Sequence, residues 1–138
     1  MSPRCRRGFT VIEVTITVAV VVLLAAVAWP SMQAQLMRAR RADAIGALTR
    51  VHVAQEQYRA RFGSYSPDLT ALRGPGSSRS PEGWYEIALQ DGAGEVVTVA
   101  ARALASGSQA RDSECRQITL HLNQGMADFG PTARCWNR

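Results

Sequence analysis

The sequence predicts an α+β protein in which a long N-terminal helix packs on a small antiparallel β-sheet. Residues 9–29 form an apolar run, residues 31–62 repeat apolar side chains at helical spacing, and three later segments alternate apolar and polar residues. A chain of 138 residues has room for one globular domain beside such a helix. The uneven distribution of apolar residues excludes an evenly soluble cytosolic domain, a disordered chain and a multi-domain enzyme.

The apolar run is long enough to cross a membrane. Its 21 residues form a helix of roughly 30 Å, the hydrocarbon thickness of a bilayer. A secretory signal peptide has the same order of basic and apolar segments, but it ends at a small-residue cleavage site, whereas this run ends at Trp29 and Pro30. We therefore expect an uncleaved or differently cleaved anchor.

The arginines on either side of the run predict its orientation. The positive-inside rule places the arginines at positions 4–7 in the cytoplasm, and the chain after Pro30 on the far side of the membrane. The arginines at positions 38–41 form a second basic cluster. This cluster opposes the predicted orientation without reversing it.

Glu13 is the one ionisable side chain inside the apolar run. A carboxylate at this depth costs several kcal/mol on insertion, so its default interpretation is a functional acid with a specific partner. The alternative is that Glu13 lies at the level of the lipid headgroups and is solvated there.

Residues 31–62 predict an amphipathic helix that follows Pro30. Pro30 lacks an N–H group and is expected to kink or interrupt a continuing helix, and Gly63 is expected to cap the C-terminal end. We expect the apolar face to pack on the sheet and the arginines of the other faces to be solvated. The predicted stripe consists of Ala44, Leu48, Val51, Gln55, Tyr58 and Phe62 and is apolar except at Gln55.

The segment after the helix predicts a short helical turn and then a loop. Ser66 is the expected N-cap of a turn that carries Leu69 and Leu72. Residues 73–81 are rich in Gly, Pro and Ser and predict a loop.

Three segments with period-two alternation predict an antiparallel sheet of three or more strands. The expected strands are residues 84–90, 96–102 and 117–122. Residues 91–94 are expected to form the hairpin turn between the first two strands, and residues 105–114 a polar loop before the third.

The N-terminal residues resemble the type III signal of type IV pilins and pseudopilins. The shared features are a short basic leader, Gly8 before the cleavage point, Phe9, Glu13 and a helix that reaches Pro30. The resemblance implies the pilin fold, cleavage between Gly8 and Phe9 by a prepilin peptidase, and N-methylation of Phe9. It also implies that Glu13 pairs with the N-terminal amine of a neighbouring subunit during assembly.

The resemblance also divides the chain and gives it a location. The implied segments are a leader at 1–8, a transmembrane and assembly helix at 9–29, its amphipathic half at 30–62 and a globular head at 63–138. The subunit would be a single-pass protein of the bacterial inner membrane with a cytoplasmic N-terminus, and its head would face the periplasm and become extracellular in the pilus. Many pilins have a mid-helix Gly where the helix melts in the filament, whereas this chain has Val22.

Two of the three cysteines are candidates for a disulfide. Cys5 lies in the leader that the resemblance implies is removed, while Cys115 and Cys135 would lie where disulfides persist. Pairing them would restrict the unfolded chain by roughly 3 kcal/mol. A zinc site competes poorly because two cysteines leave the metal under-coordinated. We expect no metal and no cofactor.

No catalytic constellation is evident in the sequence. A phosphate-binding Gly loop, an HExxH motif and a nucleophile with a base are all missing from it. Asp112 and Glu114 lie beside Arg111 and Arg116, and this favours a charged loop over paired catalytic carboxylates. The expected function is therefore non-enzymatic.

The C-terminal residues 112–136 resemble those of small minor pilins and of the competence pilins that bind DNA. The resemblance implies a minor pilin that enters type IV pili or is needed for their assembly, in adhesion and twitching motility. Its implied partners are other pilins, the prepilin peptidase and the inner-membrane assembly machinery. The alternatives are a pilin-fold DNA receptor for natural transformation and, less favoured without a dense acidic calcium loop, a type II secretion pseudopilin.

The DNA-receptor alternative requires phosphate contacts from the head, with Trp84 or Trp136 stacking on bases. The candidate contacts are Arg73, Arg79, Arg102, Arg111, Arg116, Arg134 and Arg138. The whole chain has 16 arginines against 11 acids, but residues 62–138 have seven arginines against eight acids. The net charge of +5 is therefore weak evidence for DNA binding by the head.

Overall fold

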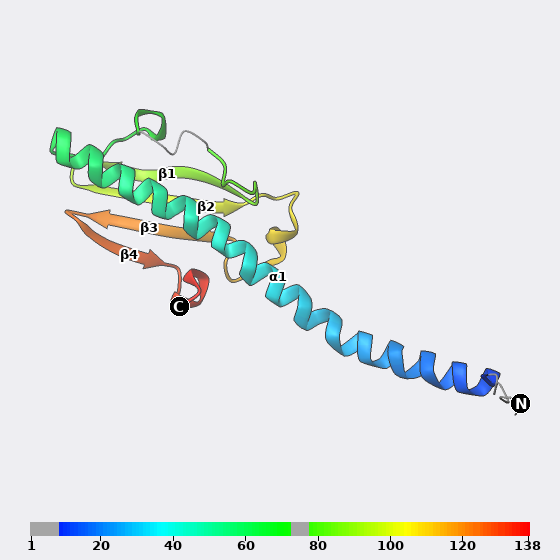
Figure 1. Cartoon of the computed structure of the whole chain (residues 1–138). Coiled ribbons are helices and arrows are strands. Elements are labelled where there is room, and N and C mark those ends of the chain that lie inside the picture. Colours follow the sequence, from blue (N-terminus) through cyan, green and yellow to red (C-terminus); the bar gives the residue numbers. More distant parts are fainter. Residues whose placement is uncertain (1–8, 73–77) are drawn as a thin grey trace, which may run out of the picture. The chain divides into compact units, whose positions relative to one another are not determined.

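The computed structural model describes residues 9–72 and 78–138. The chain divides into two compact units, one that extends to Gln35 and one from Leu36 to Arg138. Helix α1 (Val11–Phe62) contributes to both units, and each unit is described by itself (Figure 1). From here on the second unit, which includes α1 from Leu36 to Phe62, is called the head, so it is larger than the head of residues 63–138 expected from the sequence.

The part of α1 in the N-terminal unit is apolar and uncovered. In its most apolar stretch, none of the residues is buried by other parts of the chain. By length and composition, α1 can cross a membrane. The hydroxyl groups of Thr15 and Thr17 donate to the carbonyl oxygens of Ile12 and Glu13, both at 2.8 Å, so neither needs water as a partner.

Pro30 lies inside α1, and the helix continues through it. The interruption that we considered for this position is therefore wrong, while the kink at Pro30 stays a prediction. The hydroxyl of Ser31 donates to the carbonyl oxygen of Ala28 at 2.9 Å, within the helical turn that contains the proline.

The head contains a four-stranded antiparallel sheet in the order β1-β2-β3-β4. Its strands are β1 (Tyr85–Ala93), β2 (Val96–Ala103), β3 (Gln117–Asn123) and β4 (Met126–Gly130). The described residues also form three short 3-10 helices: η1 (Leu69–Ala71) and η2 (Ser108–Arg111) lie in connections, and η3 (Ala133–Trp136) follows β4. The α+β fold and the three expected strands are confirmed, and β4 completes the sheet.

The hairpin between β1 and β2 is tighter than predicted. β1 continues to Ala93, and its register with β2 shifts between Leu89 and Asp91. Gly92 has φ +138°, and a Cβ there would lie 2.4 Å from the carbonyl oxygen of Val96. Gly92, predicted in the turn, instead allows an irregular strand end, while Gly94, with φ +79°, lies with Glu95 in the turn itself.

The core lies between the second half of α1 and one face of the sheet. The predicted stripe is buried at Ala44, Leu48, Val51 and Gln55, and half-buried at Tyr58. The prediction is wrong for Phe62, which is 66% exposed because the helix ends at this residue. The N–H of Gly63 donates to the carbonyl oxygen of Arg59 at 2.8 Å, as expected for a C-terminal cap.

Gln55 is a polar member of this stripe and is fully buried. Its amide nitrogen donates to the carbonyl oxygen of Ser66 at 3.0 Å, and its amide oxygen accepts from the N–H of Ser66 at 2.9 Å. Gln55 thus fastens the segment after the helix onto α1. The N-cap of η1 is Asp68 rather than Ser66, because the Asp68 carboxylate accepts from the N–H of Thr70 at 2.9 Å.

Candidate nucleic-acid interface

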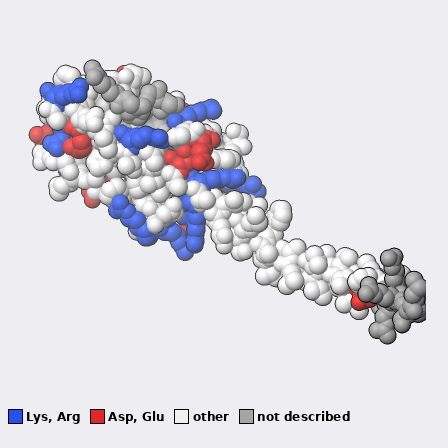
Figure 2. Space-filling view, in the orientation of Figure 1, with Lys and Arg blue, Asp and Glu red and all other residues white. Residues whose placement is uncertain are grey.

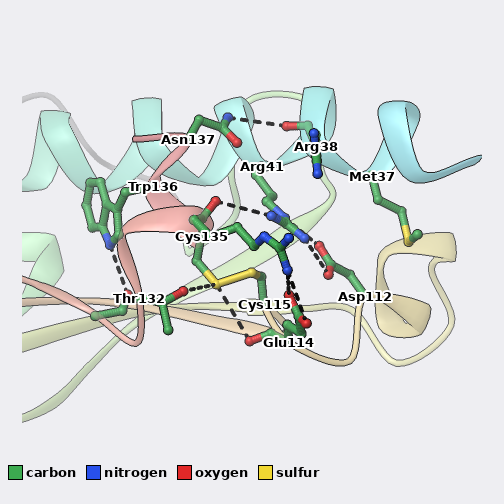
Figure 3. Close-up of a disulfide and its surroundings, with 12 residues drawn as sticks. Met37, Arg38, Arg41, Asp112, Glu114, Cys115, Thr132, Cys135, Trp136 and Asn137 are labelled. Atoms are coloured by element: carbon green, nitrogen blue, oxygen red, sulfur yellow. Dashed lines mark hydrogen bonds and ion pairs between the residues drawn. A yellow bond between two sulfur atoms is a disulfide. The ribbon is translucent and has the colours of Figure 1, made fainter. Parts of the chain in front are cut away.

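The first turns of α1 within the head contact the segment 108–116 and the C-terminal residues. The amide of Gln109 donates to the carbonyl oxygen of Met37 at 3.1 Å, and that of Asn137 donates to the carbonyl oxygen of Arg38 at 3.3 Å. These contacts join three distant parts of the sequence at the end of the head where α1 enters it, and Figure 3 shows the bond from Asn137 to Arg38.

Arg41 and Asp112 form a buried ion pair at this junction (Figure 3). The guanidinium donates from Nε and Nη2 to the two carboxylate oxygens at 2.7 and 2.8 Å, and the side chains are only 7% and 5% exposed. Its Nη1 donates to the carbonyl oxygen of Arg134 at 3.2 Å. The hydrogen bonds to Asp112 raise the pKa of Arg41 above its ordinary value.

This pair corrects two predictions. Arg41 was expected on a solvated helix face and Asp112 in a charged surface loop, whereas both are buried. Because the two residues are 71 positions apart, helical spacing alone could not reveal their contact.

Arg40 is also held within the head. Its guanidinium lies 4.1 Å from the centre of the Trp84 ring, and its Nη1 donates to the hydroxyl of Ser108. Two of the three arginines in the cluster at 38–41 thus have structural partners. These contacts give Arg40 and Arg41 a structural role that does not depend on the orientation of the apolar run.

Cys115 and Cys135 form a disulfide, and both are fully buried. The bond joins the segment just before β3 to η3 and brings Arg134 beside Glu114, with Nη1 to Oε2 at 3.1 Å. The predicted disulfide is confirmed.

Removing this disulfide is expected to lower the free energy of unfolding by about 3 kcal/mol, because it closes a loop with a sequence separation of 20. Urea denaturation of the chain from Phe9 onward in detergent would compare the oxidised protein with the Cys115→Ser/Cys135→Ser variant. Two reactive thiols in unfolded, unreduced protein would contradict the disulfide itself.

The tryptophans of the head do not form open stacking surfaces. Trp136 is 5% exposed, its Nε1 donates to the carbonyl oxygen of Gly130 at 2.9 Å, and it packs edge-on against Phe129. One face of Trp84 is covered by Arg40. The suggestion that Trp136 stacks on bases is therefore wrong, and Trp84 is only partly available.

The sheet brings together arginines that are scattered in the sequence. Arg79 pairs with Glu86, Glu86 with Arg102, and Arg102 with Gln117 across neighbouring strands. Residues that face each other across strands share one face of the sheet, here the face away from α1. The Nε of Arg102 donates to the amide oxygen of Gln117 at 3.0 Å.

Arg111, Arg116 and Arg134 lie at the same end of the sheet. Arg111 ends η2, the carbonyl oxygen of Arg116 accepts from the N–H of Ala103 at 2.7 Å, and Arg134 pairs with Glu114. With Arg38 at the entry of α1, these residues make up what we call the basic end. Its members are Arg38, Arg79, Arg102, Arg111, Arg116 and Arg134, and all six side chains are exposed.

Two predicted phosphate contacts fall outside this group. Arg73 lies outside the described residues, and Arg138 is placed over the Phe129 ring, 4.4 Å from its centre. In Figure 2 the arginines on this face lie on the head, and the apolar part of α1 shows none. The separate basic and acidic groups on the head show why its overall charge is a poor guide to its surfaces.

Two comparisons identify the family. Residues 3–29 match the prokaryotic N-terminal methylation motif, and residues 30–119, more than half of the chain, match the model described as type IV minor pilin ComP, DNA uptake sequence receptor. The chain belongs to this ComP family of type IV minor pilins. A comparison with curated proteins finds no match.

Membership of the ComP family confirms the resemblance to type IV minor pilins, and the match ends at residue 119, before most of the C-terminal segment 112–136. The methylation motif covers Gly8, Phe9 and Glu13, and the ComP match covers α1 after Pro30 and the sheet through part of β3. Pilins are structural, non-enzymatic subunits. The match is to type IV minor pilins and gives no support to the secretion pseudopilin alternative.

Tyr85 is a buried residue of this ComP-family head that the sequence did not single out. It is fully buried, and its hydroxyl makes no hydrogen bond of standard geometry among the described residues. Burial raises the pKa of Tyr85 to about 12, although the Gln109 side chain is close enough to lower this pKa in part. The folded protein therefore favours the neutral phenol, and the stability that this group contributes is present below about pH 10 and is lost as the pH rises to about 12.

Tyr85→Phe is expected to remove much of this alkaline loss and to leave the free energy of unfolding at pH 7 unchanged or higher by about 1 kcal/mol, since it deletes an unpaired buried hydroxyl. Urea denaturation at pH 7 and at pH 11 would measure both effects. Tyr58→Phe, at a half-buried position on α1, is the matched control. A loss of more than about 2 kcal/mol at pH 7 in Tyr85→Phe would show that the hydroxyl has a partner.

Proposed function

We propose that this minor pilin is a receptor for duplex DNA and that the basic end of its head is the contact surface. The observation that carries the proposal is the gathering of Arg79, Arg102, Arg111, Arg116 and Arg134 at one end of the sheet. The description of the ComP family as a DNA uptake sequence receptor supports the same conclusion.

The chemistry of this surface favours duplex over single-stranded DNA. Proteins that bind single strands without sequence preference stack bases on exposed aromatic rings. In the described part of the head, Trp136 is buried and Trp84 is covered on one face by Arg40. Arginine contacts to phosphates, which position a duplex, are the chemistry that the basic end offers.

The acids near the basic end weaken this surface only in part. Asp112 is buried against Arg41, Glu114 is paired with Arg134, and Glu86, between Arg79 and Arg102 on the sheet, offsets part of their charge. The side chains of Arg111 and Arg116 have no ion-pair or hydrogen-bond partner among the described residues. They are therefore available for a ligand with negative charges.

The route of the subunit to the pilus belongs to the same proposal. A prepilin peptidase would cut between Gly8 and Phe9 and the new amine of Phe9 would be methylated. The subunit would wait in the inner membrane with residues 9–29 in the bilayer and its head in the periplasm. It would then enter a pilus through the assembly machinery and carry DNA without any catalytic step.

The double variant Arg102→Gln/Arg116→Gln is expected to weaken binding to a fluorescent duplex by about tenfold at moderate salt, because it removes two phosphate contacts. Fluorescence anisotropy on the chain from Phe9 onward in detergent would measure the affinity. The matched control is Arg50→Gln/Arg61→Gln, which removes the same charge from two exposed helix positions without partners among the described residues. If both double variants lost the same affinity for the duplex, binding would depend only on net charge, and this would contradict the basic end as the contact surface.

A further inference from the structure

We propose that, before the subunit enters a pilus, the basic end of its head docks on anionic phospholipid headgroups of the membrane that anchors it. The arginines that carry this contact are Arg38, Arg111 and Arg116. Since Arg111 and Arg116 are also proposed DNA contacts, the consequence for DNA binding rests on the proposed function, whereas the docking itself does not.

Chain connectivity keeps the basic end near the membrane. Trp29 ends the apolar run, and tryptophan at such a position lies at the membrane interface. Met37 follows eight residues later, so its backbone lies within about 28 Å of Trp29 when the chain is extended and about 12 Å when it is helical. This limit comes from the covalent chain and holds for any arrangement of the two units.

Contacts within the head hold Arg111 and Arg116 close to the start of α1 in the head, which the segment from Trp29 to Met37 joins to the apolar run. Gln109 donates to the carbonyl oxygen of Met37 at 3.1 Å, and Asp112 holds Arg41. Arg111 lies between Gln109 and Asp112 in the sequence, and Arg116 follows the buried disulfide residue Cys115. The segment 108–116 therefore stays with the part of α1 that leads to the membrane.

The charges of the three arginines are not compensated by the head. Arg38, Arg111 and Arg116 are exposed, and their side chains have no ion-pair or hydrogen-bond partner among the described residues. The neighbouring acids are engaged, Asp112 by Arg41 and Glu114 by Arg134. A basic residue close to an anionic surface strengthens binding about fivefold, so three together give roughly a hundredfold preference over a neutral surface.

The proposed contact with lipid headgroups also gives a role to Arg38, the one arginine of the cluster at 38–41 whose side chain has no partner among the described residues. Arg40 stacks on Trp84 and Arg41 pairs with Asp112, but the side chain of Arg38 has no such partner among the described residues. Lipid phosphates would be the negatively charged partner of the Arg38 side chain.

Lipid and DNA phosphates would then compete for Arg111 and Arg116. The subunit stored in an anionic membrane would bind DNA weakly, and extraction into a pilus would free the surface. DNA capture would thereby be restricted to assembled subunits.

The docking can be tested with the chain from Phe9 onward in nanodiscs. A fluorophore on Ser106→Cys, an exposed position just before η2, reports the basic end, and one on Met126→Cys, at the exposed start of β4, is the control. Nitroxide-labelled headgroups quench a fluorophore that lies at the membrane surface. The discs contain either phosphatidylcholine alone or a mixture with phosphatidylglycerol.

We expect stronger quenching at position 106 in discs with phosphatidylglycerol and no lipid dependence at position 126. Arg38→Gln/Arg111→Gln should abolish the increase, whereas Arg50→Gln/Arg61→Gln, with the same charge change, should retain it. Equal quenching in the two lipids, or an increase that survives Arg38→Gln/Arg111→Gln, would overturn the docking proposal.

A separate readout distinguishes the two proposals. Duplex binding by the same proteins is measured in discs of phosphatidylcholine alone, where lipid charge is absent. Loss of DNA binding there, with lipid-dependent quenching intact, would refute the DNA proposal and leave docking standing. DNA binding without lipid-dependent quenching would refute the docking proposal and leave the DNA proposal standing.

Discussion

Arg41→Met is expected to lower the free energy of unfolding by about 3–5 kcal/mol, because it leaves the Asp112 carboxylate buried without its cation. The two side chains are 7% and 5% exposed, so water cannot replace the lost guanidinium. The Nη1 of Arg41 also donates to the carbonyl oxygen of Arg134 at 3.2 Å, and the variant removes this hydrogen bond as well. Urea denaturation of the chain from Phe9 onward in detergent would measure the change.

Two further variants separate this effect from a general response of α1. Arg41→Met/Asp112→Leu removes both charges and should recover much of the loss, since an apolar pair is often as stable as a buried ion pair. Arg50→Met, at an exposed position on α1, should change stability by no more than about 0.5 kcal/mol. If Arg41→Met behaved like Arg50→Met, the ion pair would not hold the junction of α1 with the head.

Glu13→Val is expected to abolish incorporation into pili while leaving membrane insertion and leader cleavage intact. The carboxylate of Glu13 has no ion pair or hydrogen bond within the described residues, and the apolar part of α1 around it is uncovered. A charge in such an apolar segment needs a partner, which the pilin resemblance assigns to the N-terminal amine of a neighbouring subunit. Immunoblots of sheared pili and of membranes would measure incorporation and insertion separately.

Thr17→Val is the matched control for this experiment. Thr17 is a polar residue one helical turn from Glu13, but its hydroxyl already donates to the carbonyl oxygens of Glu13 and Val14 at 2.8 and 2.9 Å. Its loss should therefore leave incorporation near the wild-type level. Wild-type amounts of the Glu13→Val subunit in pili would refute the assembly role of Glu13.

Local patterns predicted most of the fold. Helical spacing located α1 after Pro30, and period-two alternation located β1, β2 and β3, because both patterns reflect which face is buried. β4 escaped this reasoning, since Met126–Gly130 is short, contains Gly and Asp and has little buried surface. A turn at Gln124 and Gly125, both with positive φ, returns the chain to pair with β3, and the glycine was the available signal.

The candidate interface was less predictable because it depends on contacts between distant residues. The sequence supplied the arginines, but only strand register brings Arg79 and Arg102 onto one face of the sheet. The burial of Arg41 with Asp112 likewise depends on how the segment 108–116 folds against α1. Charge counts along the chain carry no information of this kind.

The salt dependence of duplex binding tests the central claim most directly. With up to five phosphate contacts from the basic end, a plot of the logarithm of the affinity against that of the salt concentration should be linear with a slope of about −3 to −5. The measurement uses the chain from Phe9 onward in detergent and a fluorescent duplex. No binding at low salt, or an affinity that salt does not change, would contradict a DNA-binding surface made of arginines.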